Sequence, residues 1–278
     1  MRIGPVLFNR FRLDGGSMFA AIPKALWARL HPPDDRNRID MVCRSMLIEC
    51  GDRLVLVDTG IGDRFDDKWR GILDIELTDD PFAELGVKPG DITDVVITHL
   101  HFDHAGGSTK IEGGDQVAAF PNATFHVQRD HYEWFKNPSL LDRASYRQDE
   151  LLPIERAGRL NLLDGECELL SGVSVVPLYG HVPGMQIVVV RGDRETVVYA
   201  ADLIPLASQI RLNYVMGYDL CRLLTIREKR ELLERAADGG WWLFLEHDPR
   251  TFLFRVGRTD GGFEIVEDRS DITGWLDI

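Results

Sequence analysis

The stretch Asp94-Val-Val-Ile-Thr-His-Leu-His-Phe-Asp-His-Ala-Gly-Gly107 decides how this sequence is interpreted. Its first half is a short β-branched run typical of a buried strand, and its second half is the motif H-x-H-x-D-H. His99 and His101 stand two residues apart at the predicted strand end, so their side chains project to the same side and can share one metal ion. The chain then turns and brings Asp103 and His104 towards a second ion. The stretch therefore predicts a site for two metal ions at the end of a strand.

The alternative is a polar loop whose histidines make ordinary hydrogen bonds. Three imidazoles and a carboxylate crowded at a strand end would repel one another or lack partners without a cation, which favours the metal site. In a chain with 8 histidines, a chance occurrence of the motif has a probability on the order of one in a thousand. Leu100 and Phe102 are expected to point the other way, into the core. Gly106 and Gly107 permit a tight turn where a side chain would crowd the ions.

Further metal ligands are expected at the ends of other strands, because two ions need more than four donors. His181 follows an apolar run in a turn bounded by glycine and proline, and Asp202 and His247 each end another apolar run. Taken singly, each has an ordinary explanation as a capping aspartate or as a histidine that bonds the backbone. Their shared position at the C-terminal end of an apolar run favours a common site.

Length and charge exclude several classes of partner. The chain has 278 residues, with 32 basic and 45 acidic side chains, and a formal net charge of −13. Nucleic acid and anionic lipid favour a basic face, so neither is expected as the main partner. The N-terminus lacks the apolar region of a signal peptide, no run is long enough to span a membrane, and the four cysteines form no C-x-x-C pair. These features predict one cytoplasmic domain over residues 1–278 that acts on a small molecule.

Short apolar, β-branched runs recur along the chain and are interpreted as strands. They cover residues 41–50, 54–57, 94–98, 123–127, 173–178, 186–191, 196–200, 241–245, 251–256 and 263–266. Helices are predicted at 81–85, 128–136 and 226–237, the last with a capping box of Thr225 and Glu228 and an end at Gly239-Gly240. This mixture predicts either two packed sheets with helices outside or one doubly wound sheet. The polar segments 60–80 and 137–157 are expected to be insertions over one face, as a lid or an oligomer contact.

The order H-x-H-x-D-H, then His, then Asp, then His resembles the metallo-β-lactamase superfamily of di-metal hydrolases. It is most similar to the acyl-homoserine lactonase and related lactonase/phosphotriesterase branch, and the resemblance runs from residues 56–60 to 247–249. It implies an α/β fold in which four layers form an αββα sandwich, with both metals at the sheet edges. By motif position, the ligands of the first metal would be His99, His101 and His181. Those of the second would be Asp103, His104 and His247, with Asp202 as the bridge.

Other positions either match the family pattern or depart from it. Asp58 resembles the family's aspartate that supports the metal loop from behind its ligands, although a strand-ending aspartate in a turn explains it equally well. Acyl-homoserine lactonases place a tyrosine three residues after the bridging aspartate, where its hydroxyl helps to polarise the lactone carbonyl, and this chain has Pro205 there. Asp202, where several β-lactamases have cysteine, argues against antibiotic hydrolysis, and His99, where flavodiiron proteins have glutamate, argues against redox chemistry. The tyrosines that offer a replacement are Tyr179, Tyr214 and Tyr218.

The resemblance also implies a mechanism. Two divalent ions lower the pKa of a bridging water, roughly from 15.7 towards 7, so hydroxide is the expected nucleophile. Asp103 is the expected catalytic residue, because it can carry the proton to the leaving group. Zn²⁺ is the expected metal, and Mn, Fe or Co also suit histidine and aspartate ligands. The chain has no G-x-S-x-G motif that would supply a serine nucleophile.

The predicted function is therefore hydrolysis of a lactone or another small carboxylic ester. A phosphotriesterase or aryl esterase on the same metals is the alternative within the enzyme class. A metal-binding module without catalysis is the alternative outside it. A nuclease is disfavoured by the acidic charge.

Residues 1–40 are expected to form an N-terminal arm near the active site, as in lactonase relatives. The pocket residues predicted from it are Met18 and Phe19, with Ile22 and Trp27 as further candidates, and Tyr214 and Tyr218 join them from elsewhere in the chain. Ordinary core packing explains the arm residues at least as well. Surface or structural roles are expected for His31, His126 and His131. Relatives often pair, so the resemblance also implies a homodimer.

Overall fold

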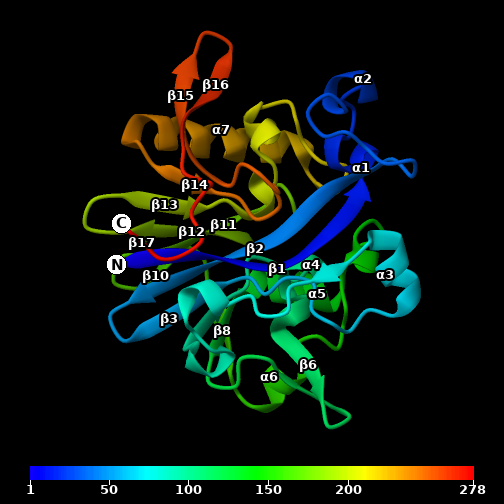
Figure 1. The fold of residues 1–278 in the computed structure, drawn as a ribbon, viewed down its shortest axis with the longest axis vertical. Coiled ribbons are helices and arrows are strands. Elements are labelled where there is room, and N and C mark those ends of the chain that lie inside the picture. Colours follow the sequence, from blue (N-terminus) through cyan, green and yellow to red (C-terminus); the bar gives the residue numbers. More distant parts are fainter.

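Two β-sheets packed face to face form the centre of the molecule, which a computed structural model describes over residues 1–278 (Figure 1). The first sheet has the order β17 (Leu276–Asp277), β1 (Arg2–Asp14), β2 (Arg38–Cys50), β3 (Arg53–Val57), β5 (Asp94–Val96), β8 (Thr124–Gln128) and β9 (Leu160–Leu163), and β4 (Glu76–Leu77) pairs with β1. The second has the order β10 (Cys167–Leu170), β11 (Val173–Leu178), β12 (Met185–Arg191), β13 (Thr196–Tyr199), β14 (Trp242–Phe244), β15 (Leu253–Thr259) and β16 (Gly262–Asp268). Strands β6 (Thr109–Glu112) and β7 (Asp115–Ala118) form a separate hairpin.

The period-2 alternation of side chains explains how the first sheet is covered on both faces. In β3, Val55 and Val57 belong to the large apolar cluster between the sheets, whereas Leu56 belongs to a second cluster on the opposite face. That second cluster includes Phe135 of α5 and Ile154 of α6. Both faces of these strands are therefore buried, which is why they appear in the sequence as continuous apolar runs.

Helices lie outside both sheets and complete a four-layer αββα sandwich (Figure 1). The first sheet is flanked by α4 (Phe102–Ala105), α5 (Arg129–Lys136) and α6 (Leu152–Arg156), and α7 (Arg222–Gly239) packs against the second. The other helices are α1 (Gly15–Phe19), α2 (Lys24–Trp27) and α3 (Asp67–Leu73). Single 3₁₀ turns are η1 (Ala83–Leu85), η2 (Pro89–Asp91), η3 (Gly106–Ser108), η4 (Arg143–Ser145), η5 (Ala201–Leu203) and η6 (Ala207–Ile210).

Strand direction brings the chemically interesting residues to one edge. Strands β3, β5, β8 and β9 are parallel, and in the second sheet β11 runs the same way as the parallel pair β13 and β14. The segments that follow β5, β11, β13 and β14 carry the predicted metal ligands. The two sheets are joined there by backbone hydrogen bonds from Val42 N to His247 O (3.2 Å) and from Gln186 N to Thr98 O (2.9 Å).

The fold predicted from the family resemblance is confirmed, and each predicted strand is present. The N-terminal segment differs from the expected arm, because residues 2–14 form the long strand β1, paired along its length with β2. Helix α7 differs as well. It begins at Arg222, so Thr225 and Glu228 lie inside the helix rather than in a capping box, and Glu228 instead accepts hydrogen bonds from the backbone of Tyr179 and Gly180. None of the helices has the length and apolar character needed to cross a lipid bilayer.

Candidate metal centre

The H-x-H-x-D-H loop folds back on itself directly after β5. His101 precedes the single helical turn α4, whose first hydrogen bonds run from the backbone nitrogens of His104 and Ala105 to the carbonyl oxygen of His101 (3.1 and 3.0 Å). The turn places Asp103 and His104 on the side of the loop that faces the second sheet. His99, His101, Asp103 and His104 are all buried.

The seven predicted ligands, which come from four segments, lie together in two groups. Asp202, in the 3₁₀ turn after β13, stands between the groups and directs one carboxylate oxygen to each. Its Oδ2 lies 3.3 Å from His181 Nε2 and 3.8 Å from His99 Nε2. Its Oδ1 lies 3.2 Å from His247 Nε2 and 3.6 Å from His104 Nε2. The first group is His99, His101, His181 and Asp202, and the second is Asp103, His104 and His247.

Three of the imidazoles have a hydrogen-bond partner on their outer nitrogen, the one that faces away from the cluster. These contacts show which nitrogen of each ring is free to bind a metal. His247 Nδ1 donates to the carbonyl oxygen of Val42 at 2.8 Å, and His181 Nδ1 faces Asp219 Oδ1 at 2.9 Å. His104 Nδ1 lies 3.0 Å from Asp58 Oδ2. When these rings are neutral with the proton on the outer nitrogen, each inner Nε2 carries a lone pair directed into the cluster.

These converging lone pairs test whether the residues fit a metal. The Nε2 atoms of His104 and His247 are 3.1 Å apart, and His99 Nε2 lies 3.1 Å from His101 Nδ1. At that separation the two nitrogens of each pair need a cation between them, either a shared proton or a metal ion. Asp202 Oδ1 is also buried without a hydrogen-bond partner. The donor set of imidazole nitrogens and carboxylate oxygens therefore fits divalent transition metals.

The electrostatics of the cluster also favour positive charge. Burial lowers the pKa of His104, but the carboxylates of Glu246 and Asp202 outweigh burial and raise it well above its usual value. Burial lowers the pKa of His99 well below normal, and the neighbouring imidazoles of His104 and His101 add to that effect. The carboxylates thus attract a cation, while His99 stays neutral and able to coordinate it.

Asp58 contacts the ligand loop at Thr98 and at His104. It follows β3 in a left-handed conformation (φ 60°), and its Oδ1 accepts a hydrogen bond from Thr98 N at 2.7 Å. Its Oδ2 accepts from the Thr98 hydroxyl at 2.7 Å and lies 3.0 Å from His104 Nδ1. A single side chain thereby fixes both the end of β5 and the ring of His104.

The glycines of the motif serve a purpose slightly different from the one predicted. A Cβ on Gly106 would collide with the carbonyl oxygen of Ile61, and a Cβ on Gly107 with that of Thr59. The close approach is therefore to the backbone of the loop after β3 rather than to the ions. The two loops interlock, with Gly107 N donating to Gly60 O at 2.9 Å.

Two buried carboxylates at the centre were not recognised from the sequence. Asp219 Oδ1 lies 2.9 Å from His181 Nδ1, and its Oδ2 accepts from Met216 N at 2.9 Å. Glu246 Oε2 lies 2.7 Å from His104 Nδ1, and burial raises the pKa of Glu246 to about 7. Glu246 stands directly before His247, which is a signal that could have revealed it. Asp219 lies 38 residues from His181 and carries no local signal.

A small cavity of about 50 Å³ opens onto the cluster. Of the predicted pocket residues, Met18 and Tyr218 line it, together with Leu13, Phe102, Asp103 and Ser145. Phe19 and Tyr214 do not line it. They pack edge to face at 5.9 Å within an apolar cluster that includes Trp27, so the core-packing alternative holds for them. Tyr179 is also outside the cavity, and its hydroxyl donates to Asp130 at 2.9 Å.

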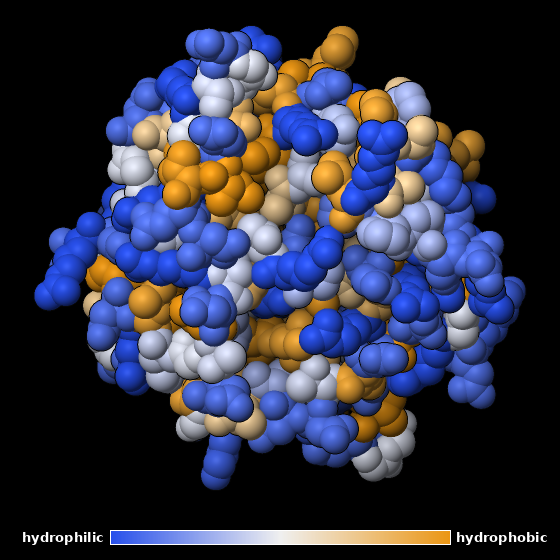
Figure 2. Space-filling model, turned by 45° about the horizontal axis from the view of Figure 1, so that its top comes forward, coloured by the Kyte–Doolittle hydropathy of each residue, from blue (hydrophilic) through white to orange (hydrophobic).

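A wider groove of about 530 Å³ continues outward from this cavity. His101, Ser145 and Tyr218 line both spaces, so the groove leads directly to the cluster. Its rim carries the exposed apolar side chains of Leu141 and Leu223. On the face drawn in Figure 2, hydrophilic side chains predominate and apolar side chains gather in separate patches.

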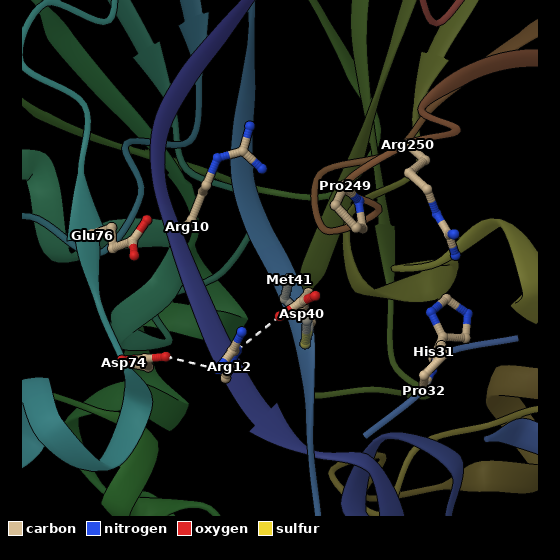
Figure 3. A pocket seen from close by; sticks show the side chains of 10 residues that line it. All are labelled: Arg10, Arg12, His31, Pro32, Asp40, Met41, Asp74, Glu76, Pro249 and Arg250. Atoms are coloured by element: carbon tan, nitrogen blue, oxygen red, sulfur yellow. Dashed lines mark hydrogen bonds and ion pairs between the residues drawn. The ribbon is translucent and has the colours of Figure 1, made fainter. Parts of the chain in front are cut away.

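Another cleft of about 520 Å³ contains none of the predicted ligands (Figure 3). Its charges are partly neutralised within the wall, because Arg12 pairs with Asp40 at 2.7 Å and with Asp74 at 3.0 Å. His31 lies in its wall, with Nε2 2.9 Å from the Ser208 hydroxyl. None of the groups of side chains that could hold a metal lies in this cleft.

Comparison with known families agrees with this geometry. The sequence pattern of the metallo-beta-lactamase superfamily matches residues 38–258. The chain belongs to this superfamily. The chain is similar over most of its length to a probable metallo-hydrolase of Mycobacterium tuberculosis. The two are 27% identical over 79% of this chain and 78% of the relative.

Relatives within the metallo-beta-lactamase superfamily include lactonases. An N-acyl homoserine lactonase of Bacillus thuringiensis is 35% identical over 104 residues, which span 37% of this chain and 34% of the lactonase. A crystal structure of a probable metal-dependent hydrolase from Staphylococcus aureus superimposes with a TM-score of 0.87 and 27% identity, covering 96% and 95% of the two chains. AidC, a dizinc quorum-quenching lactonase, shares the fold with a TM-score of 0.77 at 21% identity, over 96% of this chain and 94% of AidC.

Proposed function

We propose that this member of the superfamily is a di-metal hydrolase that opens a lactone or cleaves a small carboxylic ester. The observation that carries the proposal is the position of Asp202, whose two oxygens face two separate groups of imidazole nitrogens. One carboxylate between two groups of donors is the arrangement expected of a bridge between two ions. The lactonase relatives support hydrolysis of an ester bond.

Each ion has its own proposed ligands. Divalent ions bound there would supply hydroxide at neutral pH and an electrophile for the carbonyl oxygen of the substrate. Zn²⁺ is the proposed metal, and Mn, Fe or Co suit the same donors. His99, His101 and His181 would hold the first ion, and Asp103, His104 and His247 the second, with Asp202 shared.

Asp103 is the proposed catalytic residue. It lines the cavity, and its Oδ2 lies 3.8 Å from His247 Nε2, so it stands between the second group of ligands and the space where a substrate would lie. A carboxylate at that position can hold a proton and deliver it to the oxygen of the leaving group. No serine or cysteine nucleophile is needed for this reaction.

Tyr218 is the proposed replacement for the tyrosine that is absent at Pro205. Of the three candidate tyrosines, it is the one that lines the cavity. Burial raises the pKa of Tyr218. Its phenol is therefore protonated at neutral pH and can donate a hydrogen bond to a substrate oxygen. The adjoining groove with Leu141 and Leu223 at its rim suits an apolar group attached to the ester.

A panel of lactones, aryl esters and phosphotriesters, assayed on one sample together with metal analysis, tests the proposal. We expect about two equivalents of metal per chain and turnover of a lactone or carboxylic ester that Asp202→Ala abolishes. Preference for phosphotriesters would favour the alternative substrate class on the same metals. Tightly bound metal without turnover of any substrate would favour a non-catalytic module, and less than about one equivalent with all seven side chains intact would contradict the metal centre. The homodimer and the cytoplasmic location stay predictions.

A further inference from the structure

His131 connects the two loops that carry the ligands proposed for the first metal. It lies in the first turn of α5, wholly buried, with its ring between the loops. The backbone N–H of Leu100 donates to His131 Nε2 at 2.7 Å, and His131 Nδ1 donates to the carbonyl oxygen of Pro183 at 2.8 Å. Leu100 stands between His99 and His101. Pro183 stands two residues after His181, so one imidazole contacts both loops.

A single protonation state satisfies both hydrogen bonds. An N–H donor from Leu100 requires a lone pair on Nε2, and the carbonyl of Pro183 requires a proton on Nδ1. The neutral ring with its proton on Nδ1 meets both requirements, and burial lowers the pKa of His131 to about 4. The ring therefore acts as a rigid spacer of fixed polarity between the two loops.

The turn after His181 also packs directly against this residue. Gly184 has a left-handed backbone (φ 73°), and a Cβ there would lie 2.6 Å from the backbone nitrogen of His131. This turn belongs to the second sheet, whereas His99 and His101 follow β5 of the first. Contact at His131 thus fixes a loop of one sheet relative to a loop of the other.

The geometry of the first group leaves little tolerance in that spacing. His101 Nδ1 lies 3.1 Å from His99 Nε2 and 3.4 Å from His181 Nε2. Three nitrogens that share one ion must be held within about 0.5 Å of their productive positions. A shift of one loop against the other would move His181 away from the other two nitrogens.

We propose that His131 is a positioning residue that sets the spacing between the His99–His101 pair and His181, and thereby the affinity of the centre for its first metal ion. It belongs to neither group of proposed ligands and does not line the cavity. The inference rests on the proposed function, because it presupposes the metal centre. It adds a residue on which the assembly of that centre depends.

The test compares three substitutions at this position. His131→Leu removes both hydrogen bonds, and His131→Gln keeps a donor and an acceptor side by side. His131→Asn, with a shorter amide, reaches Pro183 but not Leu100. Zn²⁺ affinity is measured by competition with a chromophoric chelator, and the geometry of the site by the visible absorption spectrum of the Co²⁺-loaded protein. We expect one of two equivalents to bind about 10- to 100-fold more weakly in His131→Leu, with altered Co²⁺ bands. His131→Gln should recover most of that affinity, and His131→Asn should be intermediate.

His126 offers a matched control. It is also buried, and its ring is bonded on both sides, with Nε2 2.9 Å from Asp94 at the start of β5 and Nδ1 3.0 Å from Asn161. His126→Leu should lower the unfolding temperature while both equivalents bind as in the wild type. An equal loss of metal affinity in His126→Leu would overturn the inference, because general destabilisation would then explain both variants.

The remaining outcomes separate this inference from the proposed function. Wild-type affinity and an unchanged Co²⁺ spectrum in His131→Leu would overturn the role of His131 and leave the metal centre intact. If His131→Leu does not fold, equal affinities in His131→Gln and His131→Asn would overturn it in the same way. A wild-type protein that binds no metal would overturn the proposed function, and this inference with it.

Discussion

The two ends of β5 both carry buried clusters of histidine and aspartate, and the two clusters differ in whether their polar atoms are satisfied. At the start of the strand, Asp94 accepts hydrogen bonds from Arg53 Nε at 2.9 Å and from the Thr93 hydroxyl at 2.7 Å. His126 Nε2 lies 2.9 Å from the same carboxylate, and Asn161 donates to its other ring nitrogen at 3.0 Å. Each polar group of this cluster has a partner within the protein.

Beyond the end of the strand, the polar groups face one another and do not all have hydrogen-bond partners. The facing Nε2 atoms of His104 and His247 are 3.1 Å apart, and Asp202 Oδ1 has no hydrogen-bond partner. In a buried cluster with complete hydrogen bonding the polar groups satisfy one another, whereas nitrogens that face each other require a cation between them. Both clusters contain buried histidine and aspartate, so the geometry of the donors and acceptors distinguishes structure from function.

Removal of the metals should have the largest effect, and it should act on the cluster beyond the end of β5. Chelation should abolish activity and lower the free energy of unfolding by about 4 kcal/mol, if free metal had been present at roughly 1,000 times its Kd. The reason is that the ions bind the folded arrangement of ligands and not the unfolded chain. Urea unfolding of the purified, chelated and remetallated protein measures this change.

The cluster at the start of β5 supplies the control for chelation. Asp94→Asn should lose the same increment of stability on chelation as the wild type, because Asp94 contacts none of the proposed ligands. If chelation changed neither the unfolding midpoint nor the activity of the wild type, the distinction between the two clusters would be wrong.

The contrast also explains what the sequence could predict. His99, His101, Asp103 and His104 share one motif, so local spacing was sufficient to place them at a strand end. The other three proposed ligands were found because each follows an apolar run, and strand direction then brought them to one edge. Periodicity alone did not distinguish two packed sheets from one wound sheet. The family resemblance supplied the sandwich.

Residues that depend on tertiary contact were beyond reach of the sequence. Asp219 and His131 have no motif, and their partners lie 38 and 31 residues away along the chain. Residues 1–40 were interpreted as an arm from the family resemblance, whereas residues 2–14 pair with β2 as the strand β1. Phe19 was assigned to the pocket from the family resemblance and Tyr214 as a candidate tyrosine, although both pack in an aromatic cluster with Trp27.

Asp219→Ala should have the next largest effect, because it removes a hydrogen-bond partner of the proposed ligand His181. Loss of the carboxylate leaves His181 Nδ1 without its partner, so metal affinity and activity should fall by about 10- to 100-fold. Asp219→Asn retains an acceptor oxygen and should recover much of that loss. Chelator competition and kcat/KM measure the two quantities. Wild-type metal affinity and kcat/KM in both variants would show that the orientation of His181 does not depend on this contact.

Asp94→Asn should produce the smallest effect, confined to stability. Arg53 and His126 lose a charged acceptor, which should lower the free energy of unfolding by about 1 to 3 kcal/mol, while kcat and metal stoichiometry stay unchanged. Denaturant unfolding and steady-state kinetics on the same preparations measure the two quantities. A change in kcat would mean that the two ends of β5 are coupled.

The pH dependence of this loss follows from the pKa of Asp94. Burial raises that pKa, but hydrogen bonds from His126, Thr93 and Arg53 outweigh burial and hold it below its usual value. In the unfolded chain the carboxyl has an ordinary pKa near about 3.9, so the unfolded chain takes up the proton first as the pH falls. The stabilisation is therefore fully present above about pH 5 and is lost as the pH falls through the folded-state pKa. Measured on the metal-free proteins, the unfolding free energies of wild type and Asp94→Asn should approach each other as the pH falls below about 4 and meet below the folded-state pKa. Parallel curves would show that the charge of Asp94 contributes nothing to the cluster at the start of β5.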